Sequence, residues 1–311
     1  MPRKHRLISI ALYTLGFGAT FLVLFGFVGA YWPLADSVAH FRFHLVALAI
    51  LAAMGMLGLR QWRTASVYGI AGVAGLIGMT PAVPTWSGQP ELRGGQAFTL
   101  AQLNVSFENS KLESVAELVR REGADLVTLQ ELTERTARIV GLLSPDYPYH
   151  VVCGSWGVGG VAVMSRFPLA AGESRACVEK RRLTWLRVMV HGRPISVASL
   201  HLHWPYPYGQ VRQLDQLEGQ LARIPRPVLV AGDFNAAPWS HSVHRVAVAT
   251  DTRVAEGLRM TFAVRLKDWL PKLSVPIDHV LLPRAVSSVK IRATPGPGSD
   301  HAALVAKVAL P

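Results

Sequence analysis

The chain has 311 residues, of which 50% are hydrophobic and only 17% are charged, with 32 lysines and arginines against 20 aspartates and glutamates. A soluble globular domain usually carries about 25% charged residues and is shorter than this chain. Length and composition therefore argue against a single soluble domain, and the apolar excess lies in the first third of the sequence.

Three apolar runs follow one another in that first third. Leu7–Ala30 carries no charge and is long enough to cross a bilayer, Leu45–Leu59 is a second run, and Ala65–Val83 is rich in glycine and alanine, as close-packed membrane helices are. We therefore expect residues 1–84 to form a membrane anchor with about three transmembrane helices. Two alternatives stay open: a cleavable signal peptide in the first run, and one tight hairpin formed by the second and third runs.

Basic residues indicate how this anchor is oriented. They precede the first run and separate the second run from the third, at Arg3, Lys4, Arg6, Arg60 and Arg63. The loop 31–44 has only Arg42, which Asp36 offsets. Positively charged residues stay on the cytoplasmic side, so we expect the N-terminus inside, three crossings, and everything after Pro84 outside. In a bacterium this describes a multi-pass inner-membrane protein whose C-terminal two-thirds face the periplasm or the outer side.

Proline and glycine are frequent from residue 81 to 95, so 85–97 is predicted to be a linker and 98–311 a second domain. Apolar patterns then alternate between strand and helix periods. Strands are expected at 98–105, 124–130, 151–154, 160–165, 182–191, 194–202, 226–231, 275–282, 286–293 and 302–310. Helices are expected at 111–122, 132–143 and 208–224, with another beginning near His241. This interleaving predicts an α/β fold with two mixed β-sheets stacked face to face and helices outside.

The second domain is basic by itself, with 25 basic and 18 acidic residues after position 93. A basic enzyme attracts polyanions such as nucleic acid or anionic lipid headgroups, although surface lysines and arginines can also serve solubility alone. The sequence gives no sign of an obligate protein partner.

The two cysteines, Cys153 and Cys177, fall in strand-like stretches that the strand at 159–168 separates. Outside the membrane they could pair. We expect two free thiols, with a disulfide as the alternative.

Short polar motifs stand at the carboxyl ends of apolar, strand-like runs. They are Gln102-Leu103-Asn104, Leu129-Gln130-Glu131, Ser199-Leu200-His201, Gly232-Asp233-Phe234-Asn235, Ile277-Asp278-His279 and Ser299-Asp300-His301. Each motif presents a carboxylate, an amide or an imidazole, and none has a thiol nucleophile or a serine elbow. This set suits a hard divalent cation and a phosphoryl oxygen.

In this order the motifs resemble those of the endonuclease/exonuclease/phosphatase superfamily, which includes deoxyribonuclease I and the sphingomyelinases. The resemblance runs from about Thr99 to the C-terminus. It implies a four-layer α/β sandwich and hydrolysis of phosphate esters that depends on Mg²⁺ or Mn²⁺. A nuclease-type phosphodiesterase anchored in the membrane is the first expectation. The alternatives are a phospholipid or inositol-phosphate phosphodiesterase or phosphatase, and a catalytically silent binding module.

The resemblance also implies roles for individual residues. Glu131 is expected to be the metal ligand, Asn104 to support the metal or the phosphate, and Asp300 to stand near the metal. Asp233 is expected to orient or deprotonate the attacking water, and Asn235 to bind a phosphoryl oxygen. Members similar to exonuclease III carry an acid two residues after the first asparagine, where this chain has a serine. That departure puts a second strong metal site in doubt.

Two histidines complete the expected site. Asp278 can accept a hydrogen bond from one ring nitrogen of His301 and favour the imidazolium, whose other nitrogen would face the phosphate as negative charge develops. Both side chains are expected to line a solvated cleft. The resemblance assigns His201 a contact with the phosphate, whereas His279, beside Asp278, is interpreted as structural.

Overall fold

The computed structural model describes residues 3–80, 97–154, 159–178, 180, 182–264, 273–284, 286 and 288–309. The predicted linker at 85–97 lies outside these residues except for its last position.

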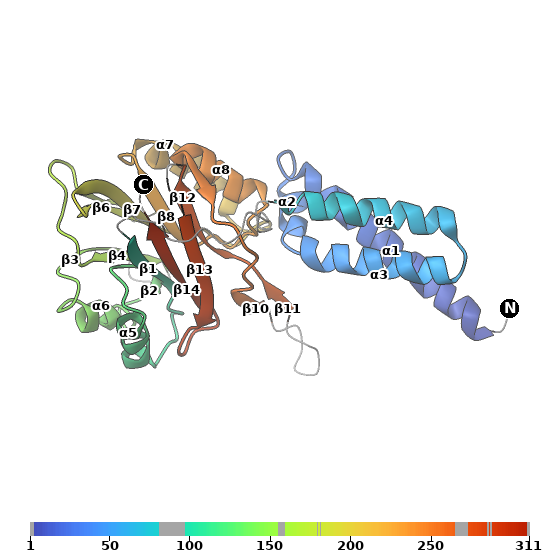
Figure 1. The fold of residues 1–311 in the computed structure, drawn as a ribbon, viewed down its shortest axis with the longest axis horizontal. Helices are drawn as coiled ribbons and strands as arrows, with labels where there is room; N and C mark the ends of the chain where they lie inside the picture. Colours follow the sequence, from blue (N-terminus) through green and yellow to red (C-terminus); the bar gives the residue numbers. More distant parts are fainter. Residues whose placement is uncertain are drawn as a thin grey trace.

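Residues 3–80 form a helical region. It consists of α1 (Arg3–Phe25), the 3-10 turn η1 (Gly26–Val28), α2 (Pro33–Ala39), α3 (Arg42–Gly58) and α4 (Trp62–Ile77). Helices α1, α3 and α4 lie side by side in a bundle that projects from one end of the molecule, and α2 stands at the junction with the rest (Figure 1). Glycine permits this close approach, because a Cβ on Gly75 would lie 2.3 Å from a methyl group of Val46 on α3.

The helical region is apolar on its outside as well as its inside. Most of the exposed large apolar side chains of the described residues belong to it. The segment Arg6–Val28 has 23 residues and a mean hydropathy of 2.1, which is long and apolar enough to cross a membrane. Helices α2 and α3, bent by 68°, pass the same criterion only together. The described part of the chain thus has one such segment, or two if the bent pair counts as one span, and the three-span anchor stays a prediction.

The second domain carries two six-stranded sheets and a two-stranded ribbon. Its strands are β1 (Ala97–Asn104), β2 (Leu126–Leu132), β3 (Tyr149–Cys153), β4 (Gly160–Ser165), β5 (Arg175–Val178), β6 (Leu183–Val190), β7 (Arg193–His201), β8 (Val228–Asp233), β9 (Thr252–Val254), β10 (Phe262–Val264), β11 (Leu273–Val275), β12 (Asp278–Pro283), β13 (Ser288–Pro295) and β14 (Ala302–Ala309). The first sheet has the order β13-β14-β1-β2-β4-β3, the second β5-β6-β7-β8-β12-β9, and β10 pairs with β11.

Four helices cover the outer faces of the two sheets. They are α5 (Leu112–Arg121), α6 (Arg138–Leu143), α7 (Gln210–Arg223) and α8 (His241–Thr250). One apolar core, with Leu126 and Val197, fills the space between the sheets. A second packs α5 and α6 against the first sheet, and a third packs α7 and α8 against the second sheet. The expected four-layer sandwich is confirmed, and Figure 1 shows the helices on the outside.

Two elements differ from the expectation for local reasons. The helix expected at 132–143 begins only at Arg138, because Thr133 and Thr136 hold the preceding residues in a turn through a backbone-to-hydroxyl hydrogen bond of 2.9 Å. The strand expected at 275–282 is split into β11 and β12 at Pro276, whose nitrogen cannot donate to a ladder.

The expectation of two free thiols was wrong, because Cys153 and Cys177 form a disulfide. Their strands are separated in sequence by β4, but β3 is the edge of the first sheet and β5 is the edge of the second. Stacking the sheets places the two edges face to face, with the Cα atoms 5.2 Å apart. The disulfide therefore joins the two sheets at one side of the sandwich.

Candidate active site

The topology brings the polar motifs to one end of the sandwich. Strand β1 runs parallel to β2, and β7 runs parallel to β8, so each pair presents its carboxyl ends together. His201 lies opposite Asp233 in the register of β7 and β8, and Asp278, at the start of antiparallel β12, also lies opposite Asp233. His301 stands directly before β14, which pairs antiparallel with β1. The ends of both sheets therefore surround Asp233.

Strained backbone aims two of these side chains. Glu131 sits at a bulge between Gln130 and Leu132, where its φ is 57°, and Asn235 has a φ of 46°. Non-glycine residues rarely adopt this left-handed conformation, and at functional sites it re-aims side chains. Gly232 is required for a different reason: a Cβ there would lie 1.9 Å from the carbonyl oxygen of Leu200 on the neighbouring strand.

The amide of Asn104 connects the first two carboxylates. Its Nδ2 donates to Glu131 Oε1 and to Asp233 Oδ2, both at 3.0 Å. Its Oδ1 accepts from the Ser106 backbone N–H at 2.9 Å, which fixes the orientation of the amide. Glu131 Oε2 accepts from the Phe107 N–H at 3.1 Å. One amide thus holds two acidic side chains close together.

Asp278 and His301 form a buried ion pair, with His301 Nδ1 2.9 Å from Asp278 Oδ2. Burial lowers the pKa of His301, but the charges of Asp278 and Asp233 outweigh it and raise the pKa to about 10. Burial pushes the pKa of Asp278 upward, but the charge and hydrogen bond of His301 bring it below the usual value. Exposures of 1% for Asp278 and 5% for His301 show that the expectation of a solvated cleft was wrong.

Asp233 stands between the two histidines. Its Oδ2 lies 3.8 Å from His301 Nε2 and 3.7 Å from His201 Nε2. Its Oδ1 accepts from the Asn235 N–H at 2.8 Å. Burial raises the pKa of Asp233 to about 7, against the lowering effect of the His301 charge. Asp233 can therefore take up a proton near neutral pH.

His201 differs electrostatically from His301. Burial, and then the positive charge of Arg182, hold the pKa of His201 well below its usual value, so its ring is neutral at pH 7. Its Nε2 lies 3.9 Å from Glu131 Oε1, and its Nδ1 has no hydrogen-bond partner among the described residues. A neutral imidazole beside two carboxylates suits a metal ligand or a hydrogen-bond donor to phosphate.

Among the described residues, two overlapping groups have ligand atoms within 4.8 Å of one another: Glu131, His201 and Asp233, and Asp233, Asp278 and His301. The first group fits a divalent cation, because it offers two carboxylates and a neutral imidazole. The second group does not fit a cation, because the His301 ring is protonated and already pairs with Asp278. Asp300 is exposed and belongs to neither group, although its charge contributes to the raised pKa of His301.

The side-chain amide of Asn235 has one atom with a partner and one without. Its Nδ2 donates to the Leu202 carbonyl oxygen at 2.9 Å, while its Oδ1 is buried without a partner among the described residues. Such an atom is costly unless a ligand satisfies it. His279 is structural as expected, because its Nε2 lies 2.7 Å from the Ala236 carbonyl oxygen in the protein interior.

Sequence reasoning assigned no role to a polar network beneath the site. Gln102 Nε2 donates to Gln130 Oε1 at 2.9 Å and to Asp278 Oδ1 at 3.0 Å, and Gln130 Nε2 donates to Ser199 Oγ at 3.0 Å. This chain crosses from the first sheet to the second and fixes Asp278. Gln102 stands two residues before Asn104, and Gln130 stands one residue before Glu131. Both are polar residues in largely apolar strands, and this was the signal that could have revealed the network.

Two further residues border the site without any motif. Arg182, with a φ of 54°, is close enough for the charges of Glu131 and Asp233 to raise its pKa, although burial lowers it more. The ring of Phe262 lies 4.8 Å from that of His301, between centroids, and 5.7 Å from Trp204. Both reach the site through tertiary folding, so no local pattern marked them.

Comparisons with known proteins agree with this geometry. The profile of the endonuclease/exonuclease/phosphatase family matches residues 101–301. No curated protein gives a significant sequence match.

Solved structures share the fold at low sequence identity. Truncated TDP2 from Caenorhabditis elegans is 16% identical with a TM-score of 0.51, covering 68% of this chain and 98% of that one. Danio rerio TDP2 in complex with a single-strand DNA product is also 16% identical, with a TM-score of 0.52 and the same two coverages. An endonuclease/exonuclease/phosphatase from Beutenbergia cavernae is 20% identical, with a TM-score of 0.51, covering 69% of this chain and 72% of that one.

Proposed function

Because the chain belongs to the endonuclease/exonuclease/phosphatase family of hydrolases, we propose that it is a divalent-metal-dependent phosphodiesterase anchored in a membrane. The observation that carries the proposal is the buried cluster around Asp233. Asp233 lies within 4 Å of a neutral imidazole, that of His201, and of a protonated imidazole, that of His301, and it shares a group of possible metal ligands with the Glu131 carboxylate.

Glu131 and Asn104 would hold the metal, with the neutral ring of His201 beside them. Mg²⁺ or Mn²⁺ bound there supplies a Lewis acid that polarises the phosphate. Asp300, outside the cluster, would add negative charge at its edge.

The other side chains act on water and phosphate directly. Asp233 orients the attacking water and accepts its proton, since its two oxygens are fixed by Asn104 and by the Asn235 N–H. His301, held by Asp278, places positive charge where the phosphate becomes more negative. Asn235 and His201 hold the phosphate, and the unpartnered Asn235 Oδ1 would bind a water or hydroxyl donor.

Nucleic acid is the first candidate substrate. After residue 93 the chain has 25 basic and 18 acidic residues, which favours a polyanion. The DNA product bound to the Danio rerio TDP2 structure fits the same class of substrate.

A membrane lipid with a phosphodiester headgroup is the second candidate. The loop that follows His201 carries the exposed aromatic side chains Trp204, Tyr206 and Tyr208. The Ser37 hydroxyl of α2 donates to the Tyr206 carbonyl oxygen at 3.2 Å, so this loop lies against the helical region. Aromatic rings beside the end of a membrane-spanning region are typical of the interface between bilayer and water.

We further propose that the catalytic domain lies outside the cytoplasm. The disulfide between Cys153 and Cys177 supports an oxidising compartment. The apolar outer surface of the helical region supports its insertion in a bilayer.

Replacing Glu131 with glutamine tests the metal. Glu131→Gln keeps the shape but removes the charge, so hydrolysis should fall by orders of magnitude and recover in part with excess Mg²⁺ or Mn²⁺. The matched control is Glu134→Gln, three residues along and exposed, which should change little. Substrates should include single- and double-stranded DNA, RNA, phospholipids and inositol phosphates. Full activity in the presence of a chelator would refute metal dependence.

A further inference from the structure

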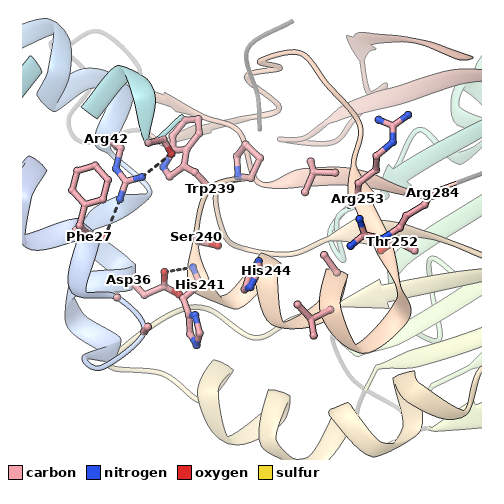
Figure 2. A pocket seen from close by; sticks show the side chains of 18 residues that line it. Phe27, Asp36, Arg42, Trp239, Ser240, His241, His244, Thr252, Arg253 and Arg284 are labelled. Carbon is pink, nitrogen blue, oxygen red and sulfur yellow. Dashed lines mark hydrogen bonds between the residues drawn. The ribbon is translucent and has the colours of Figure 1, made fainter. Parts of the chain in front are cut away.

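A cavity of about 460 Å³ lies between the helical region and the catalytic domain (Figure 2). The helical region contributes residues near η1, α2 and α3, and the catalytic domain contributes α8, β9 and the residue after β12. None of the side chains assigned to catalysis or metal binding lines it. The cavity is therefore a second site.

Its walls are fixed by hydrogen bonds between the two domains. Asp36 of α2 accepts from the backbone N–H of His241 at 2.7 Å, and from the N–H and hydroxyl of Ser242 at 3.0 and 2.7 Å. Trp239 Nε1 donates to the Ala39 carbonyl oxygen at 2.6 Å. The Trp239 ring also packs against the apolar cluster of the helical region. The cavity thus keeps a defined shape.

Three arginines make the cavity positive. Arg42 is 4% exposed, and it donates to the carbonyl oxygens of Gly78 and Gly26, both at 3.0 Å. These partners are neutral, and its Nε has no partner among the described residues. The charge of this guanidinium is therefore not neutralised by direct contact with a carboxylate.

Arg253 and Arg284 stand across the cavity from Arg42 (Figure 2). Within the described part of the chain, the Arg253 guanidinium donates to the Val286 carbonyl oxygen, at 3.5 Å. Arg284 pairs with Asp251 at 3.0 Å, but both side chains are about 70% exposed, where such a pair is weak. Asp36 is the one acidic residue among the described lining residues, and α8 engages both of its oxygens.

The walls also carry exposed apolar surface on both sides. Phe27 on the helical side is 45% exposed, and Val248 on α8 is 66% exposed. Large apolar side chains exposed beside cations fit an amphipathic ligand with an anionic group. Guanidinium groups bind phosphate through paired, charge-assisted hydrogen bonds.

We propose that this cavity binds the phosphate headgroup of an anionic phospholipid. The inference rests on the proposed membrane location. Because η1 follows the end of α1, a membrane-spanning α1 would place the cavity at the level of the lipid headgroups. The phosphate lies at Arg253 and Arg284, Arg42 adds positive charge from the opposite wall, and the acyl chains start along the apolar side chains of the cavity. The lipid is a bound ligand at this site and not the substrate of the catalytic cluster.

The test uses the full chain, purified in detergent with a chelator so that no hydrolysis can occur. Native mass spectrometry measures the binding of phosphatidylglycerol and of phosphatidylcholine. We expect selective retention of phosphatidylglycerol, weakened at least about tenfold in Arg253→Gln/Arg284→Gln, because each guanidinium offers the phosphate charge-assisted hydrogen bonds that glutamine cannot. A double variant at exposed arginines outside the cavity, Arg175→Gln/Arg223→Gln, removes the same charge and should change binding less than about twofold.

A second pair of variants introduces a negative or a positive charge at the same position of the cavity wall. Val248 is exposed, so Val248→Glu and Val248→Lys should both fold, but only the glutamate should weaken phosphatidylglycerol binding. Equal losses in the two arginine double variants would overturn the proposal, as would equal retention of phosphatidylcholine.

A third arm separates a lipid from a free phosphate ester. Glycerophosphoglycerol, the deacylated form of phosphatidylglycerol, has the same phosphodiester headgroup without acyl chains. If it displaced phosphatidylglycerol at equal concentration, the ligand would be a soluble phosphate and the lipid proposal would be wrong. Because binding is measured without metal, a chain that binds lipid but hydrolyses nothing would refute the proposed function and leave this inference standing.

Discussion

The carboxylate of Asp278 and the imidazole of His301 are expected to act as one unit in catalysis. His301→Ala and Asp278→Asn should each lower turnover by roughly 10²–10⁴-fold, the range for a positioned charge-stabilising group. The double variant should be little worse than His301→Ala, because the aspartate then has no ring to orient. Steady-state kinetics of the three variants check this. Additive losses would assign Asp278 a separate role, such as a ligand of the metal.

The same pair should make stability depend on pH. The pKa of His301 is raised from 6.5 to about 10 in the folded protein. Its contribution to stability is therefore fully present below about pH 6.5 and is lost as the pH rises through about 10. The difference in thermal unfolding midpoint between the wild type and His301→Gln should shrink from pH 6.5 toward pH 10. Parallel curves over this range would contradict the assignment of a protonated His301.

At the scale of elements, α8 depends on the other domain for its N-terminal cap. Ser240 accepts from the Val243 N–H at 3.2 Å, but the His241 and Ser242 N–H groups are satisfied by Asp36, about 200 residues away in sequence. Asp36→Ala should lower the free energy of unfolding by about 1–2 kcal/mol, with Asp36→Asn intermediate. Thermal unfolding checks this against Glu117→Ala, an exposed acid on α5, which should have little effect. Equal effects of the two alanine variants would show that the contact is unimportant.

The apolar pattern of the sequence predicted the central strands and helices well, because an apolar run or a helical repeat is contained within a few neighbouring residues. The buried strands β4 and β8 are apolar runs up to their last residue, and the inner stripe of α7 repeats at helical spacing. The motif residues stand at strand ends. Parallel pairing gathers Asn104 with Glu131 and His201 with Asp233, whereas Asp278 and His301 join them through the antiparallel strands β12 and β14.

Features that depend on distant partners could not be predicted in this way. The short strands β9 and β10 have three residues each, too few for a periodic signal. The disulfide requires knowledge of which strands are the edges of the two sheets. Arg182 precedes a strand of the second sheet and reaches Glu131 of the first sheet only through the packing of one sheet on the other. The burial of Asp278 and His301 likewise follows from tertiary packing and not from their motifs.

At the scale of the whole molecule, the number of membrane crossings decides where the catalytic domain lies. With the N-terminus inside, one or three crossings place the domain outside, whereas two crossings leave it in the cytoplasm. Helix α1 alone gives one crossing, α1 with the bent pair α2 and α3 gives two, and the addition of α4 gives three.

We predict the outward arrangement. Arg60 lies between α3 and α4, and Arg63 lies in the first turn of α4, so the positive-inside rule holds that end of the two helices in the cytoplasm and returns the chain outward through α4. A disulfide in the catalytic domain favours the same side. An alkaline phosphatase reporter, which is active only outside the cytoplasm, should be active when fused after Pro311 and inactive when fused after Arg60. A fluorescent cytoplasmic reporter at the same two positions should give the opposite result. Fluorescence after Pro311 together with an inactive phosphatase there would reverse the topology, and would leave the disulfide without an oxidising compartment in which to form.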